Sequence, residues 1–278
     1  MQHRSNPIQP DSAHSFSMLL KQWRTQRGFS QLELSLASRV SQRHISFLES
    51  GRANPSRAMV LELAAVLDVP LRHQNLMLTA AGFAPIHTET DLSALEMTSI
   101  RKALDFMLRQ QEPYPAVIID RYWNLLLTND AATRLLTAFL DMETLHTHAS
   151  MDGKLNLMQA MFHPQGLRPF IVNWRECAEH LLHRVRREVT SEGNSDQSTQ
   201  LLNTLMSYPG VTELWHIPKR VEQNTLLLTV HFKRDSLDWQ FFSTIATLGT
   251  AYDITLQELR IECLFPADED TERYWKHR

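Results

Sequence analysis

Apolar residues recur every three or four positions through residues 16–82, in short runs broken by Gly, Pro, Ser and Asn. This period predicts a series of short amphipathic helices. In the first of them, Phe16, Leu20 and Trp23 lie on one apolar stripe, and Gly28 follows as a stop. The expected helices span about 16–27, 30–37, 42–50, 57–67 and 71–81.

Start and stop signals support these helices. The run "SQLE" from Ser30 to Glu33 is a capping box, in which the serine hydroxyl and the glutamate carboxylate each accept a backbone N–H. Ser41 and Ser56 are the expected N-caps of the third and fourth helices, and Gly51 ends the third. The head of the chain is therefore predicted to be a bundle of five helices.

The pattern changes in the second half of the chain. After one more amphipathic helix that carries Ile100, Ala103, Leu104, Met107 and Leu108, the runs "AVIID" and "WNLLLTN" read as a β-hairpin. A helix is expected from Asn129 or Asp130. Further helices are expected near 155–162, 170–189 and 197–207. Three more strand-like runs, "TLLLTVHF", "LDWQFFSTIATL" and "ITLQELRIECLF", complete five strands.

These patterns predict a two-domain chain of class α + α/β. Residues 1–14 read as a flexible tail, 15–84 as a five-helix domain and 85–98 as a linker. Residues 99–278 are then an α+β domain with a five-stranded antiparallel sheet and flanking helices. A length of 278 residues is comfortable for two domains.

Neither the composition nor the N-terminus indicates a secreted, membrane-spanning or disulfide-bonded protein. The N-terminus lacks a signal-peptide pattern, no apolar run has the ~18 residues of a membrane span, and the two cysteines are far apart. We therefore expect a reduced cytoplasmic protein with no membrane partner.

Charge is unevenly distributed along the chain. Residues 1–82 hold nine Lys and Arg against five Asp and Glu, whereas the remainder holds nineteen against twenty-six. A basic head on an acidic body indicates that the head binds a polyanion, although an excess of four charges is modest.

The third predicted helix carries the candidate chemistry. Val40, Ile45 and Leu48 can face the second helix, near Leu34 and Leu36 or Ala37. The outward face then presents Gln42, Arg43 and Ser46. Amide, guanidinium and hydroxyl groups on a protruding helix are the groups that read base edges in a major groove. A lone polar residue there is usually only solvated. Here the two helix lengths, the short turn, the cap, the stop and the polar face all agree.

Groups around this face are candidates for the DNA backbone. Gln31 opens the second helix, where backbone N–H groups favour a phosphate. The predicted backbone contacts are Gln31, Arg39, Ser41, His44, Arg52 and Asn54.

Several stretches of the sequence resemble a known protein family. "SQLELSLASRVSQRHISFLESGRANPS" resembles the helix-turn-helix of the Xre/Cro–C1 repressor family. "VIIDRYWNLLLTNDAA", "HPQGLRPFIVNW", "RVRRE" and "FFSTIATLGTAYDITLQELRIECLFPADEDTE" are similar to its branch with an MmyB-like ligand-binding domain. The resemblance covers roughly 16–275. It implies a bacterial transcription regulator with a lambda-repressor-like head that binds operator DNA as a homodimer. It also implies a PAS-like domain that senses a small molecule.

The chain departs from this family at one position. Arg39 stands in the helix-turn-helix turn where such repressors usually have Gly. If the position needs a positive φ, Arg costs about 1 kcal/mol relative to Gly.

The sequence patterns that could indicate a metal site or a catalytic site are weaker than the helix-turn-helix pattern. The pairs His146 with His148 and His180 with His183 could suggest a metal, but no Cys or carboxylate pattern of recognised spacing accompanies them. No phosphate loop, nucleophile elbow or zinc-protease motif is present, and Cys177 reads as partly buried on its helix. We therefore expect no metal, no cofactor and no enzymatic activity.

The second domain is rich in large apolar side chains, which are mostly core. Five strands flanked by helices can also enclose an apolar pocket at the sheet face. We expect it to hold a small hydrophobic or amphipathic effector, for example a fatty-acyl compound. The candidate lining residues are Trp123, Trp174, Phe232 and Phe241.

The sequence thus predicts a sequence-specific DNA-binding regulator, most simply a repressor. The alternative is a protein-binding adaptor, antitoxin-like or scaffold, that uses the helix-turn-helix for protein contacts. Because DNA binding releases counterions, the salt dependence of binding to duplex DNA separates the two classes.

Overall fold

A computed structural model gives the fold of the chain, which divides into two compact units. The first contains residues up to 90 together with 250–257, and the second contains 91–249 and 258–278. Each unit has its own hydrophobic core, as expected for separate domains. The residues described are 15–141, 143–144, 147, 150–151, 153–191, 196–215, 227–249 and 251–277. The tail predicted at 1–14 lies outside them.

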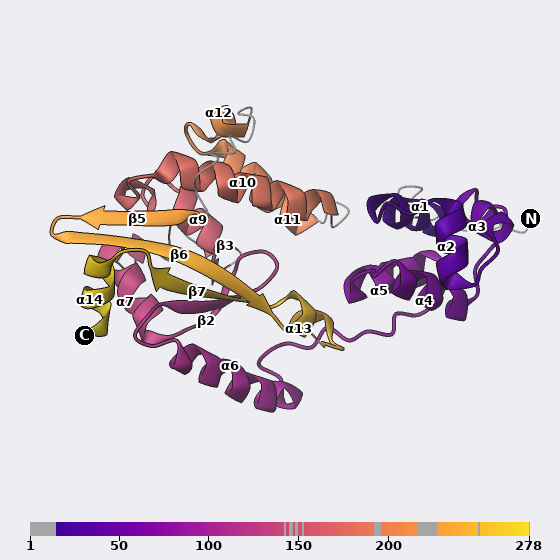
Figure 1. Ribbon diagram of the computed structural model, residues 1–278, viewed down its shortest axis with the longest axis horizontal. Coiled ribbons are helices and arrows are strands. Elements are labelled where there is room, and N and C mark those ends of the chain that lie inside the picture. The colour runs from indigo at the N-terminus through magenta and orange to yellow at the C-terminus, as the bar shows by residue number, and fades with distance from the viewer. Residues whose placement is uncertain are drawn as a thin grey trace, which may run out of the picture. The chain divides into compact units, whose positions relative to one another are not determined.

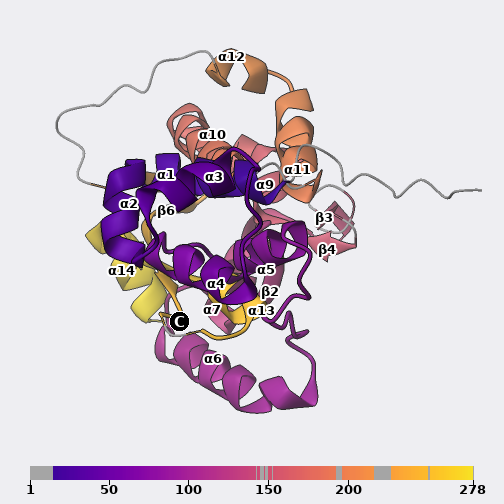
Figure 2. The same cartoon turned by 90° about the vertical axis from the view of Figure 1, so that its right-hand side faces the viewer.

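The five predicted N-terminal helices are confirmed (Figures 1 and 2). The capping box is also confirmed: the Ser30 hydroxyl accepts the Glu33 N–H at 3.1 Å, and the Glu33 carboxylate accepts the Ser30 N–H at 2.7 Å. The serine side chains of Ser41 and Ser56 cap the next two helices. The helices are α1 Phe16–Gln26, α2 Gln31–Ser38, α3 Gln42–Glu49, α4 Arg57–Val66 and α5 Leu71–Ala80.

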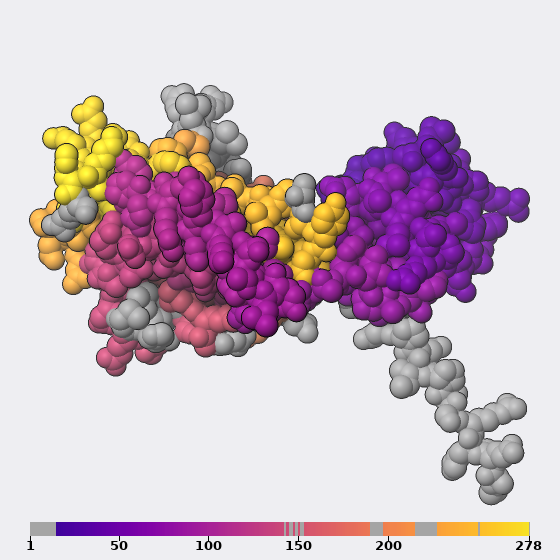
Figure 3. Space-filling model, turned by 90° about the horizontal axis from the view of Figure 1, so that it is seen from below, coloured from indigo at the N-terminus to yellow at the C-terminus, as the bar shows by residue number. Residues whose placement is uncertain are grey.

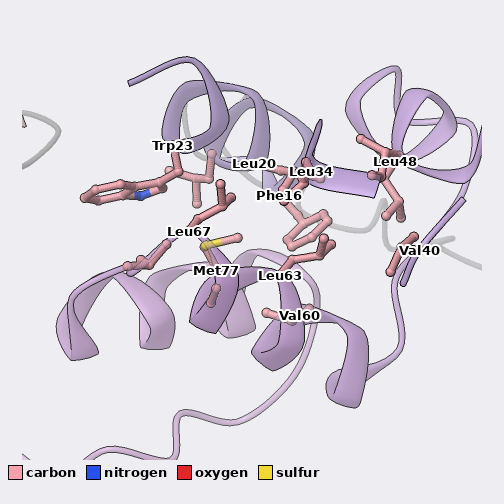
Figure 4. Packing of buried hydrophobic residues seen from close by; sticks show 14 of the residues in the cluster. Phe16, Leu20, Trp23, Leu34, Val40, Leu48, Val60, Leu63, Leu67 and Met77 are labelled. Atoms are coloured by element: carbon pink, nitrogen blue, oxygen red, sulfur yellow. The ribbon is translucent and has the colours of Figure 1, made fainter. Parts of the chain in front are cut away.

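The core of this unit lies between the five helices, and Leu34, Ile45 and Leu48 are fully buried in it. Figure 4 shows how α1, α3, α4 and α5 contribute side chains to one cluster. The suggestion that Leu36 or Ala37 faces α3 is wrong. Leu36 is 76% exposed, and the buried small residue of this turn is Ser38, whose hydroxyl donates to the Leu34 carbonyl at 2.7 Å. That bond satisfies the serine inside the core.

Arg39 adopts the left-handed conformation, with φ at 57°. The turn between α2 and α3 therefore does need the positive φ that the usual Gly supplies without strain. Because Arg39 has a side chain, this conformation costs backbone energy. The side chain is exposed, so its guanidinium can reach outward.

The second unit is built on a five-stranded antiparallel sheet with the order β2-β1-β7-β6-β5, which agrees with the expected PAS-like fold (Figure 1). The predicted hairpin is β1 with β2, and Asn129 caps the helix that follows, α7. The strands are β1 Ala116–Ile119, β2 Leu125–Thr128, β5 Thr229–Arg234, β6 Leu237–Thr247 and β7 Arg260–Pro266, and a separate short hairpin pairs β3 Ser150–Met151 with β4 Lys154–Leu155.

Helices flank the sheet, and the strongly periodic segments are confirmed as helices. On α10 the predicted stripe is buried at Ala178, Leu182 and Val185. Cys177 is buried as well, more deeply than the sequence suggested. The helices are α6 Thr98–Gln110, α7 Asp130–Phe139, α9 Leu157–Phe162, α10 Trp174–Ser191, α11 Asp196–Ser207, α12 Val211–Trp215, α13 Ile254–Glu258 and α14 Glu269–Lys276, with 3-10 turns η2 Leu95–Met97 and η3 Arg168–Phe170.

Two strand predictions need correction. The run 254–265 is a strand only from Arg260, because its first residues form α13. The carboxylate of Asp253 accepts the Thr255 N–H at 2.9 Å, and this local cap starts a helix instead of continuing the strand. The run 225–232 begins as a strand only at Thr229; residues 225 and 226 lie outside the described part.

The buried face of α6 is narrower than predicted. Leu104 and Leu108 are buried, whereas Ala103 and Met107 point toward solvent together with Phe106. Figure 3 shows the outer side of α6. Residues 104 and 108 lie one turn apart on one side, so the positions one residue earlier are turned away from it.

No helix within the described ranges has both the length and the apolar character to span a bilayer.

Candidate DNA interface and ligand pocket

The polar face of α3 points outward as predicted. Gln42 and Arg43 are exposed, while His44 and Ser46 are half-buried at the edge of this face. Ser41 is exposed, and its hydroxyl accepts the His44 N–H at 3.3 Å as the N-cap of α3. Beneath them, Ile45 and Leu48 anchor the helix in the core. The first turn of α3 therefore presents an amide and a guanidinium on a firmly held helix.

The guanidinium of Arg43 is supported by an aromatic ring. It lies 5.3 Å from the centroid of Phe47, and Arg52 lies over the same ring at 5.6 Å. Such cation–π contacts hold a long side chain with less loss of freedom on binding. This role of Phe47 was not predicted from the sequence, although its spacing of four residues from Arg43 is a recognisable signal.

A partly buried ion pair between Arg24 and Glu49 links α1 with α3, and Gln31 joins it from α2. The Arg24 guanidinium donates to both oxygens of Glu49, at 2.5 and 3.0 Å, and also to the Phe29 carbonyl at 2.7 Å. The Gln31 amide donates to Glu49 Oε2 at 2.8 Å. Burial raises the pKa of Glu49, but these hydrogen bonds outweigh it and lower the pKa below its usual value. Glu49 is thus charged at neutral pH and fixes the angle of α3 against its neighbours.

The six predicted backbone contacts surround α3. Arg39, Arg52 and Asn54 are exposed, so their side chains are accessible to a phosphate. The side-chain amide of Gln31, in contrast, already donates to Glu49. We expect any phosphate contact of Gln31 to come from the N-terminus of α2, where backbone N–H groups lack helical partners.

A pocket of about 440 Å³ lies inside the second unit. Its wall comes from β1, α7, α9, α10 and the sheet strands β5, β6 and β7, and most of the side chains are apolar. The volume is in the range of small-molecule sites. Its polar lining groups include Ser243 and Glu262 on the sheet and His180 and Arg184 on α10.

Two of the four predicted lining residues, Trp123 and Phe232, are on this wall. Trp174 and Phe241 pack elsewhere. The Trp174 indole N–H donates to the Met161 carbonyl at 3.0 Å, and the Arg168 guanidinium lies over the ring. Phe241 is fully buried and packs against Trp275. Aromatic content alone does not separate the lining of a pocket from the core behind it.

Trp123, which lines the pocket, is surrounded by charged side chains. The indole N–H donates to Glu188 at 3.0 Å, and the guanidinium groups of Arg184 and Arg260 lie 4.6 and 5.5 Å from its ring. Trp123 has a positive φ of 68°, an unusual conformation for a bulky residue. Asp120 stabilises this turn by accepting the backbone N–H groups of Tyr122 and Asn124.

Glu262 is a pocket residue that the sequence analysis did not single out. Burial raises the pKa of its carboxyl group, while a hydrogen bond with Ser243 and the charges of Arg184 and Arg260 act in the opposite direction. The available signal was a charged residue two positions before Leu264, on the same face of a predicted strand.

Other candidate chemistry has less support. Burial raises the pKa of the Cys177 thiol to about 12, so the group is a neutral thiol rather than a nucleophilic thiolate at physiological pH. His146 and His148 lie outside the described residues. Within the described residues, no three His, Cys, Asp or Glu side chains are grouped as metal ligands would be.

Comparisons with known proteins agree with this architecture. Residues 100–276 match the family "MmyB-like transcription regulator ligand binding domain", and residues 20–74 match "Helix-turn-helix". A search of curated proteins gives no match. One similar solved chain is "Structure of an RNA-binding Light-Oxygen-Voltage Receptor", with 11% identity and a TM-score of 0.29. The alignment covers 95% of this chain and 63% of that one, and a similarity this low carries no argument about function.

The helix-turn-helix match falls on the first compact unit, and the ligand-binding match, which alone spans more than half of the chain, covers most of the second. The exposed α3 and the pocket in the second unit agree with these matches. The chain belongs to the family of helix-turn-helix transcription regulators that carry an MmyB-like ligand-binding domain.

Proposed function

We propose that this DNA-binding regulator is a repressor that reads its operator with α3, binds as a homodimer and responds to a small hydrophobic effector. The observation that carries the proposal is the exposed pair Gln42 and Arg43 on a helix whose other face is buried. These are the side chains that recognise adenine and guanine edges in the major groove.

Backbone contacts are expected to add affinity without sequence information. Arg39, Arg52 and Asn54 are exposed around α3 and are suited to bind phosphates. A symmetric dimer places two α3 helices in successive major grooves, so we expect half-sites about 10 bp apart. Sedimentation showing a monomer both free and on a palindromic site would remove the dimer from this proposal.

The pocket supports the effector. It is largely apolar and has a volume of about 440 Å³, which suits a compound of moderate size with one polar end. A compound of this kind regulates the protein only if its affinity differs between the DNA-competent and incompetent states.

Salt dependence tests the DNA-binding role against the adaptor. The two exposed arginines that are predicted to bind phosphates, Arg39 and Arg52, give four cations per dimer. We therefore expect log K to fall with log salt with a slope of about −3 to −4. The measurement is fluorescence anisotropy with a duplex that the full chain selects from a random pool.

Arg52→Ala provides the internal check. It removes one cation per copy and should reduce the slope by about 2 for a dimer. A slope near zero in the unsubstituted protein would instead favour the protein-binding adaptor.

A further inference from the structure

Two polar residues interrupt the apolar wall that the sheet gives to the pocket. Ser243 on β6 is paired with Leu264, and Glu262 on β7 is paired with Ile245. All four line the pocket, because they alternate with outward residues along two adjacent antiparallel strands. The hydroxyl of Ser243 hydrogen-bonds to the Glu262 carboxyl group. This bond uses only part of the hydrogen-bonding capacity of a carboxyl group.

The two cations near Glu262 are already paired with another carboxylate, that of Glu188. Arg184 donates to Glu188 at 3.2 Å and Arg260 lies 2.9 Å from the same carboxylate oxygen. Both guanidinium groups also act electrostatically on Glu262. Both cations are therefore already engaged with Glu188. A charged end of a ligand would have to compete with Glu188 for these cations, whereas an uncharged end would not.

We propose that the pocket takes an amphiphile with an uncharged, hydrogen-bond-donating end, such as an alcohol or primary amide, and that this end binds Glu262 and Ser243. The inference rests on the proposed effector and names its chemical class. A hydroxyl or amide both donates and accepts, so it pairs with either protonation form of a carboxyl group. The apolar part of the ligand lies against residues such as Leu136, Val230 and Phe232.

A series of eight-carbon compounds tests this class. Octan-1-ol, octanamide, octanoate and octylamine share a chain and differ in the polar end. In isothermal titrations of the full chain, we expect the alcohol and the amide to bind at least tenfold more tightly than the two ions. Glu262→Leu should remove this preference, while Glu262→Gln, which keeps the length and the hydrogen-bonding capacity, should retain it.

Glu213→Leu, at an exposed position of α12, is the matched control and should change nothing. Tighter binding of octanoate or octylamine would overturn the assignment of the polar end but leave the effector in place. Failure of all four compounds to bind would remove the proposed effector and this inference together. A preference that persists in Glu262→Leu would show that other groups recognise the ligand.

A separate observation concerns the connection between β6 and β7. Residues 251–257 of this connection are part of the compact N-terminal unit. Asp253 is 9% exposed, and its Oδ2 accepts the hydroxyls of Thr88 and Thr90, each at 2.8 Å, and the Thr90 N–H at 3.1 Å. Burial raises the pKa of Asp253, but these hydrogen bonds outweigh it and lower the pKa. The charged carboxylate is thus firmly held.

The same connection caps a helix of the DNA-binding unit. Helix α5 begins at Leu71 after Pro70, which offers no side-chain cap. The Leu71 N–H instead donates to Gln257 Oε1 at 2.8 Å. The next residue, Glu258, pairs with the buried Arg121 of the second unit at 2.8 Å. Four residues further along, β7 reaches Glu262 in the pocket.

We infer that α13 couples the pocket to the DNA-binding unit. Strands β6 and β7 form part of the pocket wall, so filling the pocket shifts them. The short helix α13 passes the shift to Asp253 and Gln257 and through them to the start of α5. Allosteric coupling of this kind is a free energy shared by two sites, and it is measurable as non-additivity.

A double-mutant cycle in the full chain tests the coupling. Val230→Phe fills the pocket from β5 without any ligand, and Asp253→Ala removes the contacts with Thr88 and Thr90. We expect Val230→Phe to change the Kd for the selected duplex at least fivefold, and we expect Asp253→Ala to abolish that change. Asp253→Asn is a milder second variant and should weaken it.

Asp235→Ala, at the exposed turn that joins β5 to β6, is the control and should preserve the effect of Val230→Phe. Equal effects of Val230→Phe with and without Asp253 would overturn the coupling, and so would no effect on DNA binding in the unsubstituted background. Circular dichroism at the assay temperature identifies any variant that is unfolded, and Asp253→Asn then replaces Asp253→Ala.

Discussion

Replacing Arg43 with alanine should weaken binding to the selected duplex by about 1–3 kcal/mol, while binding to a scrambled duplex changes little. The reason is geometric. Arg43 is exposed on the first turn of α3, and the ring of Phe47 supports its guanidinium from one side. A guanidinium held in this way can form two hydrogen bonds with guanine, and alanine forms none. Anisotropy titrations of both duplexes at one salt concentration measure the effect.

Two variants sharpen this experiment. Arg43→Lys keeps the charge but loses the planar pair of donors, so it should lose most of the specificity and retain the nonspecific affinity. Arg109→Ala removes an exposed arginine from α6 in the other unit and should leave both affinities unchanged. An equal loss on both duplexes in Arg43→Ala would mean that Arg43 binds only a phosphate.

Replacing Leu48 with alanine should destabilise the N-terminal unit by about 2–5 kcal/mol. Leu48 is fully buried on the inner side of α3 and packs in the cluster of Figure 4. The substitution removes apolar contacts and leaves a cavity directly beneath the recognition surface. Because the chain has two units, a single unfolding curve would mix them. Hydrogen exchange of peptides from residues 15–90, measured by mass spectrometry, reports on this unit alone.

Leu36→Ala is the matched control for Leu48→Ala. It makes the same chemical change one helix away, at a side chain that is 76% exposed. Its effect should stay within about 0.5 kcal/mol. If the two substitutions gave equal exchange rates, the core in Figure 4 would not be what holds α3 in place.

The helices of the N-terminal unit could be predicted closely because their ends are local. The reciprocal bonds of Ser30 and Glu33 and the caps at Ser41 and Ser56 join residues three apart. Such signals act before any tertiary contact forms. The direction of Leu36 was harder, since Leu34 and Leu36 are both apolar, and only packing against α3 and α4 decides which one is buried.

In the second unit, hydrophobic periodicity did not predict every element correctly. The run 254–265 alternates well enough to resemble one long strand, yet Asp253 turns its first part into α13. Asp253 is held by Thr88 and Thr90, more than 160 residues earlier in the chain. No pattern within a short window contains that information. The same holds for Trp174 and Phe241, which have the composition of pocket residues but pack in the core.

The sequence by itself determined the two-domain class, the five N-terminal helices, the five strands and the outward polar face of α3. These features depend on period, caps and turn residues, which act between near neighbours. Only the tertiary structure decided that Phe47 supports Arg43, that the Gln31 amide binds Glu49, that Glu262 lies in the pocket and that residues 251–257 join the N-terminal unit. Those arrangements depend on which distant segments come into contact. Hydrophobic burial drives these contacts, but it is non-directional, so the apolar pattern of a segment does not specify its partner.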